Sequence, residues 1–251
     1  MVYSPLDRRT ERTYQLGAGD PSLTFVVRIA RTEADLQLAL DIRRRKYANH
    51  HPTLAELLAY EDKRDRQAGS IVFLAKNKLD GRCLGSVRLE TNISRPLQIE
   101  RDVVLPSKFR RARLLHVTRF AVESGSEGII VKRSLLKAMY LYSRAKEIDF
   151  ALISTIGLSA RLFYRIGFKD VFPANRHVRL GEYGGLEVKL LAQRISLLSR
   201  NAKSLEGDEM RRFINEFRHP DIQIFDSVSS SWEQPRQVQL VQNVTGIAVP
   251  T

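Results

Sequence analysis

Alternating apolar and polar residues mark several short stretches of the chain as β-strands. The first is "LTFVVRIA", residues 23–30. Two more, "SIVFLAKN" and "CLGSVRLET", flank Asp80-Gly81, a dipeptide that is typical of a tight hairpin turn. Farther along the chain, the pattern predicts a short buried strand at "DFALISTIG" and a last strand at "GLEVKLLAQRI".

Other stretches carry apolar residues at the spacing of a helix. Thr32 can cap a helix that has Asp35 at its third position and apolar residues through Ile42. A short helical pattern follows Pro52. A later helix would share one apolar stripe among Ile130, Leu135, Met139 and Tyr142. "LSARLFYRIGF" predicts one more helix, which Gly167 closes.

Strands and helices mix along residues 23–195, which predicts an α/β or α+β fold with a central, mainly antiparallel sheet. We expect an N-terminal arm at 1–22, one domain at 23–198 and an extension at 199–251. Within the extension, "GDEMRRFINEF" predicts an amphipathic helix. Its leading expected role is packing on the core; covering a cleft, pairing two subunits and touching membrane lipid are the alternatives.

Polar side chains gather on one predicted strand, "LLHVTRFAV", just before a turn with glycines. Strict alternation would place residues 116, 118, 120 and 122 on one face and residues 115, 117, 119 and 121 on the other. His116, Thr118 and Arg119 thus fall within four residues of an otherwise apolar strand. This cluster is the first candidate for chemistry.

Composition narrows the class of protein. The 251 residues are 43% hydrophobic, enough for a sizeable core. The single cysteine, Cys83, excludes an internal disulfide framework and a cysteine-based zinc site. No run has the length of a membrane span or the layout of a signal peptide. We therefore expect a reduced, cytoplasmic, soluble protein without a metal.

The formal net charge of +13 favours acidic partners, which include nucleic acid, anionic lipid and a small acidic protein. The chain has no zinc-finger spacing, RRM-like aromatic motif or basic-zipper heptad, so nucleic acid is not expected. Two cationic runs are dense: "RRRK" at 43–46 and "KFRRAR" at 108–113. The second comes directly before the strand with His116.

"ISTIGLSARLFYRIGFKDVF" resembles the end of the GNAT acyltransferase core. The resemblance implies that this strand splays from its neighbour beside residue 116 and that the pantetheine arm of a thioester lies in the gap. It also implies that Tyr164 faces the gap, where its hydroxyl can protonate a leaving thiolate. The alternative for Tyr164 is an ordinary aromatic residue that packs on the sheet.

One feature of that family is missing. Most acetyl-CoA users have an Arg/Gln-x-x-Gly-x-Gly/Ala turn that cradles the pyrophosphate. Here the turn reads "ESGSEG", with Gly125 and Gly128 in a different pattern. A thioester on a protein needs no such grip. We therefore expect an acyl carrier protein as donor, with acyl-CoA as the alternative.

Four further segments, "DIRRRKYA", "YEDKRD", "GSVRLE" and "HVTRFAVE", resemble in order and spacing the acyl-homoserine-lactone synthases. They resemble still more closely the long-chain N-acyl amino acid synthases, the FeeM-like group, over about residues 24–195. The resemblance implies a substrate site formed by Arg43, Tyr47, Asp62, Asp65, Arg88, Thr118 and Phe120, and a catalytic group formed by His116, Arg119 and Tyr164.

His116 stands where that family usually has a glutamate. Neutral imidazole can take a proton from an amine at pH 7, but it cannot anchor a cation as a carboxylate does. The amine would then be held by Asp62 or Asp65. The alternative for His116 is a core histidine hydrogen-bonded to backbone. Together, three arginines (43, 88, 119) and two aspartates would form a recess for a zwitterion or a structural salt-bridge network.

These features predict an N-acyltransferase that moves a fatty acyl group from a carrier-protein thioester to the α-amine of an amino acid. The amine would attack directly, because no motif supports Cys83 as a nucleophile. Phe120, Leu152 and Phe163 could line the acyl groove, although core packing is their expected role. Lys108, Arg110, Arg111 and Arg113 would form a basic rim near the cleft mouth that docks the acidic carrier.

The alternative enzyme is an acyl-homoserine-lactone synthase that uses S-adenosylmethionine. Those enzymes usually place a tryptophan shortly after the Arg-x-x-x-aromatic motif. Here that region reads "ANHHPTLAEL", and the single tryptophan, Trp232, lies in the tail. A non-catalytic GNAT-like domain is a further alternative.

Overall fold

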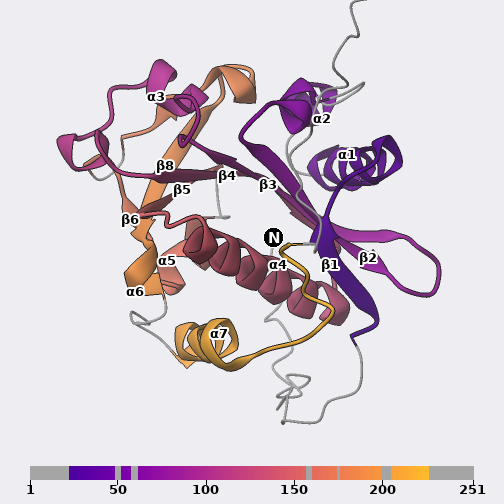
Figure 1. The fold of residues 1–251 in the computed structure, drawn as a ribbon. Helices are drawn as coiled ribbons and strands as arrows, with labels where there is room; N and C mark the ends of the chain where they lie inside the picture. The colour runs from indigo at the N-terminus through magenta and orange to yellow at the C-terminus, as the bar shows by residue number, and fades with distance from the viewer. Residues whose placement is uncertain are drawn as a thin grey trace, which may run out of the picture.

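A twisted sheet with helices on both faces forms the frame of the protein (Figure 1). The computed structural model describes residues 23–48, 52–57, 62–156, 160–173, 176–198 and 205–225. Its strands are β1 (Phe25–Ile29), β2 (Ser70–Asn77), β3 (Cys83–Thr91), β4 (Leu114–Val122), β5 (Phe150–Thr155), β6 (Lys169–Asp170), β7 (Val178–Arg179) and β8 (Glu187–Arg194). They follow the order β1-β2-β3-β4-β5-β8-β6, and β7 also pairs with β8.

The helices and helical turns connect these strands. They are α1 (Glu33–Ala48), α2 (Pro52–Leu57), η1 (Lys63–Arg66), α3 (Gln98–Asp102), η2 (Ser107–Phe109), α4 (Ser126–Ala145), α5 (Ala160–Arg165), η4 (Gly181–Tyr183), α6 (Ile195–Leu198) and α7 (Leu205–Glu216). Only β4 and β5 pair in parallel; all other named strand pairs among the described residues are antiparallel. The predicted α/β class with a mostly antiparallel sheet is confirmed.

Local sequence signals set several of these elements. The Thr32 hydroxyl accepts a hydrogen bond from the Asp35 amide at 3.1 Å and caps α1, as predicted. Asp80 and Gly81 form the turn between β2 and β3, and Gly81 has a φ of 72°. Of the predicted stripe on α4, residues 135, 139 and 142 are buried and Ile130 is half-buried.

The two faces of the sheet differ in chemistry. Residues 87 and 89 of β3, residues 115 and 117 of β4 and residues 151 and 153 of β5 belong to the apolar core under α4. The opposite face carries the polar residues 86, 88, 90, 116, 118 and 154, all buried. Helix α1 packs on this polar side of β3 and β4, opposite to α4 in Figure 1.

Residues 205–225 of the predicted extension pack on the rest of the fold. Helix α7 lies against α4, and Met210, Phe213 and Ile214 are buried there. Residues 221–223 then run along β1, where the Val27 amide donates to the Asp221 carbonyl at 2.7 Å. The predicted arm at 1–22 and residues 226–251 lie outside the described residues. None of the described helices is long and apolar enough to span a membrane.

A β-bulge interrupts β4. Ser86 of β3 pairs with Ala121 of β4, and Arg88 pairs with Thr118. One residue of β3, Val87, therefore lies opposite two residues of β4, which is the definition of a bulge. The extra residue bends β4 at the point where its polar side chains gather.

The bulge changes which face the next residues occupy. Arg119 has a φ of 54°, in the left-handed region, and its side chain bonds to Asp62 on the same face as Thr118. Phe120 instead packs with the core under α4. The predicted alternation, with Arg119 opposite Thr118 and Phe120 beside it, is wrong because it allowed no extra residue.

Strands β4 and β5 part just beyond His116. The register pairs His116 with Leu152 and ends at Val117 with Ile153. From Thr118 onward, β4 has β3 on one side and no paired strand on the other among the described residues. The sheet was predicted to part beside residue 116 itself, and this is wrong: the gap opens two residues later, at the bulge.

Candidate functional site

His116 is fully buried on β4 and bonds to a side chain of the next strand. Its Nε2 lies 2.8 Å from the hydroxyl oxygen of Ser154 on β5. The expected alternative, a core histidine bonded to backbone, is not what the contacts show. Burial lowers the pKa of His116 below its ordinary value, so the imidazole is neutral at pH 7.

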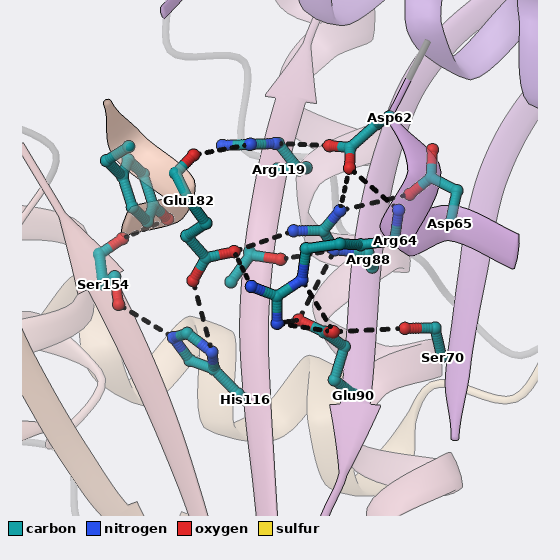
Figure 2. Close-up of polar contacts among 12 residues, drawn as sticks. Asp62, Arg64, Asp65, Ser70, Arg88, Glu90, His116, Arg119, Ser154 and Glu182 are labelled. Carbon is teal, nitrogen blue, oxygen red and sulfur yellow. Dashed lines mark hydrogen bonds and ion pairs between the residues drawn. The ribbon is translucent and has the colours of Figure 1, made fainter. Parts of the chain in front are cut away.

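Glu182 supplies the carboxylate that sequence analysis did not find. It comes from η4, and its Oε1 lies 3.6 Å from Nδ1 of His116 (Figure 2). The other oxygen, Oε2, accepts a hydrogen bond from Arg88 at 2.8 Å. The short segment "GEYGG" has no motif around Glu182. Only the loop before β8 brings it over the sheet.

Two aspartates and three arginines from four elements form a buried network. Asp62 bonds with Oδ1 to Arg88 at 2.7 Å and with Oδ2 to Arg119 at 2.7 Å. Asp65 accepts from Arg43 at 2.5 Å. Arg88 and Arg119 hold the pKa of Asp62 far below its usual range, against the opposing effect of burial. The five residues that sequence analysis placed in one group therefore all lie together in this network.

Sequence analysis also missed Glu90 and Arg64, which complete this network. Glu90 lies opposite His116 in the β3–β4 register, and Arg64 of η1 bonds both of its carboxylate oxygens at 2.8 and 3.0 Å. The Ser70 hydroxyl donates to Glu90 as well. A register drawn from the predicted hairpin could have shown Glu90, because residues of one face alternate along a strand.

The completed network balances its charges. The cations are Arg43, Arg64, Arg88 and Arg119, and the anions are Asp62, Asp65, Glu90 and Glu182. Arg43 and Arg88 are fully buried and Asp65 is 4% exposed. A zwitterion would have to displace these ion pairs. Of the two predicted roles, the contacts support the structural network, and Arg43, Asp65 and Arg88 do not line an open recess.

Aromatic residues lie next to the charged network and next to the point where β4 and β5 part. Tyr183 stacks on Arg119, with the guanidinium carbon 5.3 Å from the ring centre. The half-buried Tyr47 donates a 3.5 Å hydrogen bond to the carbonyl of Phe120. Phe120 packs edge-to-face on Phe163 at 6.4 Å, on the α4 side of the bulge. Of the predicted substrate residues, Tyr47 and Phe120 thus flank the point where β4 and β5 part.

Tyr164 lies away from the gap. Its hydroxyl donates to Asp170 on β6 at 2.8 Å, and β8 and β5 separate β6 from β4. Burial and the Asp170 carboxylate raise the pKa of Tyr164 to about 12. The prediction that Tyr164 faces the gap and protonates the thiolate is therefore corrected: its proton is held at the edge of the sheet.

The cationic run at 108–113 borders a hollow of about 450 Å³, which Lys108, Arg110, Arg111 and Arg194 line. Arg113 is paired with Glu147 at 2.5 Å instead. The hollow lies at the first residues of β4 and β5, whereas these strands part at their far ends. The predicted position of the run at the cleft mouth is wrong, because parallel strands carry their two ends to opposite edges.

Cys83 is buried, and burial raises its pKa to about 11. Its thiol donates to the Gly85 carbonyl. A protonated, buried thiol is a poor nucleophile, in keeping with the expectation that Cys83 has no such role. The described residues hold no cluster of three or more potential metal ligands.

Comparison with known proteins finds solved structures that are similar to the structure of this chain. No family model matches the chain, and no curated protein sequence matches it. The structure of FeeM, an N-acyl amino acid synthase from uncultured soil microbes, superposes with a TM-score of 0.55 and 19% identity, over 71% of this chain and 94% of that one. The GNAT family N-acetyltransferase YhbS from Escherichia coli, solved with CoA, gives a TM-score of 0.47 and 15% identity over 73% of this chain and 88% of that one. At these identities the first likeness shows the fold, and the chain has a GNAT-like fold.

Proposed function

We propose that the protein is an N-acyltransferase that moves a fatty acyl group from a thioester to the α-amine of an amino acid. The observation that carries this proposal is the position of His116. A buried, neutral imidazole lies one residue before the last pair of β4 and β5, in a GNAT-like fold. FeeM, whose structure is similar, is an N-acyl amino acid synthase.

His116 has the properties of a general base for this reaction. Its lowered pKa leaves the ring neutral, and Nε2 is directed toward β5 at the parting of the strands. Beyond Val117 the β4 backbone has no paired strand on the β5 side among the described residues. Backbone amides at such a gap can stabilise the oxyanion that forms when the carbonyl is attacked.

The turn before α4 favours a carrier protein over CoA as the donor. Glu127 places a carboxylate in the first turn of α4, where a diphosphate would bind a helix N-terminus, whereas Glu123 is paired with Arg45 and Lys46. A carboxylate there repels phosphate. A Cβ on Gly128 would lie 1.9 Å from the Glu123 carbonyl, so this glycine serves the tight turn itself. We therefore propose acyl carrier protein as the donor.

The docking surface of that carrier is proposed to be the basic hollow with Lys108, Arg110 and Arg111. These side chains are exposed and can meet an acidic helix. From Leu114, the first residue of β4, to Thr118 the strand takes four steps, a rise of about 13 Å at ~3.3 Å per residue. An extended pantetheine arm is long enough to cover this distance.

The test is a product analysis. Purified protein is incubated with acyl carrier protein thioesters of several chain lengths, or with the matching acyl-CoA, and with mixed amino acids or S-adenosylmethionine. Mass spectrometry is expected to show N-acyl amino acids from the carrier thioester at a higher rate than from acyl-CoA. A lactone product, or no acyl transfer with any pairing, would overturn the proposal.

A further inference from the structure

We propose that Ser154 is a covalent nucleophile that carries the acyl group as an ester before the amine receives it, with His116 as its base and Glu182 as the residue that orients His116. This proposal rests on the proposed acyltransferase function and gives its mechanism two steps in place of direct attack by the amine. It is carried by three side chains from three separate elements: β5, β4 and η4 (Figure 2).

The three side chains have the arrangement of a nucleophile, a base and an orienting acid. The hydroxyl oxygen of Ser154 lies 2.8 Å from Nε2 of His116, and Oε1 of Glu182 lies 3.6 Å from Nδ1 of the same ring. The ring thus has a hydroxyl on one nitrogen and a carboxylate on the other. The order of the groups, hydroxyl, imidazole and carboxylate, is the one by which a serine is activated in hydrolases and transferases on unrelated folds. Here the carboxylate lies beyond hydrogen-bond distance from the ring.

Two buried atoms in this group lack a hydrogen-bond partner, Nδ1 of His116 and Oε1 of Glu182. They face each other across 3.6 Å, and Oε2 of Glu182 is held by Arg88 at 2.8 Å. A carboxylate in this place favours the tautomer with the proton on Nδ1. Nε2 then carries a lone pair and accepts the Ser154 proton.

Ser154 lies at the point where β4 and β5 part. In the register of β4 and β5 it is the first β5 residue beyond the last pair, Val117 with Ile153. It retains 9% exposure, whereas His116 has none. The Tyr183 hydroxyl donates to the Ser154 carbonyl at 3.5 Å, which ties this residue to the segment that carries Glu182.

The alternative role, a clamp between β4 and β5, needs only the bond between Ser154 and His116. It leaves Glu182 with only its ion pairs to Arg88 and Arg64, which hold Oε2, and assigns no role to Oε1 beside the second ring nitrogen. Arg88 compensates this charge from β3. Glu182 thus holds a negative charge beside Nδ1 of His116. A base that becomes cationic during the reaction requires such a charge.

The chemistry is a double displacement. The Ser154 oxygen attacks the thioester carbonyl and its proton passes to Nε2 of His116; the C–O bond forms, the C–S bond breaks, and the leaving thiolate takes that proton. The amine of the amino acid then attacks the ester carbonyl and gives a proton to Nε2. The C–N bond forms, the C–O bond breaks, and the Ser154 oxygen regains its proton.

The experiment traps the ester. Full-length protein is mixed with acyl carrier protein thioester, or acyl-pantetheine, without an amine, and is analysed by intact mass and peptide mapping. We expect one acyl group on Ser154, released as N-acyl product when amino acid is added. Ser154→Ala should lose the adduct and lower the rate of acyl transfer at least about 100-fold. Thr155→Val is the matched control, since its hydroxyl has no partner and belongs to the next β5 residue; it should keep both.

Ser154→Cys secures the result if Ser154→Ala unfolds. Its adduct is a thioester, which neutral hydroxylamine cleaves, whereas the ester on Ser154 resists it. Product formation without any adduct in a single turnover, with Ser154→Ala at the parental rate, would overturn the covalent role and leave the proposed function standing. No product and no adduct with any donor would overturn both.

Glu182→Gln tests the positioning residue. Its carboxylate raises the pKa of His116 against the effect of burial. Its loss should lower kcat with KM little changed and shift the acid limb of the pH–rate profile to lower pH. A purely structural role would lower the stability without moving that limb.

Discussion

At the scale of single residues, Asp62 is the carboxylate on which two buried arginines converge. Arg88 and Arg119 each bond one of its oxygens at 2.7 Å, and the Asp62 side chain is 5% exposed. A buried ion pair gains little over an apolar pair, but removal of one partner leaves a charge without compensation. The contribution of Asp62 to the free energy of unfolding is therefore detected mainly when this residue is replaced.

Asp62→Asn is expected to lower the free energy of unfolding by about 3–5 kcal/mol. The amide keeps the shape of the side chain but leaves Arg88 and Arg119 with less compensating charge. Denaturant unfolding measures the loss. The control is Asp41→Asn, an exposed carboxylate on α1, which should change the stability by less than about 0.5 kcal/mol. Equal effects of the two substitutions would contradict this account of the network.

His116 should make the stability depend on pH in the acid range. Its pKa is lowered in the folded state, so the unfolded chain binds the proton first as the pH falls below about 6.5. The free energy of unfolding then decreases with falling pH, by up to about 1.4 kcal/mol per pH unit. His116→Gln should remove this part of the dependence. Unfolding curves of both proteins from pH 7.5 to 5 give the difference; parallel curves would show that His116 does not titrate as argued.

At the scale of elements, the bulge in β4 decides what the strand presents. It puts Thr118 and Arg119 on one face, sends Phe120 to the other, and coincides with the end of the pairing between β4 and β5. The alternation before and after the bulge is regular. One added residue therefore accounts for both the charge cluster and the parting of the strands.

Deletion of Arg119 tests this account. Without it, residues 118 and 120 become neighbours, the alternation is continuous, and Val87 faces a single residue of β4. We expect a folded protein in which β4 pairs further with β5 and acyl transfer is lost. The matched variant Arg119→Gly keeps the extra residue at its φ of 54° without the charge. Arg119→Gly should retain measurable activity. If the deletion variant is as active as Arg119→Gly, the bulge is not needed for acyl transfer.

At the scale of the whole molecule, α7 and the following segment complete two surfaces. Three apolar side chains of α7 are buried against the rest of the fold, and Lys137 of α4, 2% exposed, donates to the Ile214 carbonyl. Burial lowers the pKa of Lys137 to about 8. Residues 221–223 cover the free edge of β1. The central sheet is therefore closed by a part of the chain that sequence analysis placed outside the domain.

Ending the chain at residue 198 should destabilise the protein by at least about 5 kcal/mol, because Met210, Phe213 and Ile214 no longer bury their side chains. Thermal unfolding and light scattering would show a lower Tm and aggregation through the uncovered α4 face. A chain that ends at residue 225 keeps all of the contacts described and is the control. A chain of 198 residues that is as stable as this control would refute the role of α7.

The proposed docking of an acidic carrier also belongs to the scale of the whole surface. Arg111→Glu is expected to raise KM for the carrier thioester about tenfold or more and to leave KM for acyl-pantetheine unchanged, because only the protein donor meets this surface. Arg179→Glu, an exposed charge reversal elsewhere on the sheet, is the matched control. Initial rates at several salt concentrations would measure both. In the parent protein, salt should affect the rate with the carrier thioester and the rate with acyl-pantetheine to different extents. This difference should disappear in Arg111→Glu; if it persists, the carrier docks elsewhere.

The sequence by itself determined six of the eight named strands, the helix cap at Thr32, the hairpin at Gly81 and the identity of most charged residues in the network. These follow from alternation, helical spacing and turn chemistry, which act over a few residues. Tertiary structure alone decided which residues meet His116. Glu182 arrives from a loop and Ser154 from a parallel strand, and one extra residue in β4 turned Arg119 to the polar face. The physical reason is that local pattern fixes the spacing of side chains along an element, whereas register, bulges and loop closure fix which elements face one another.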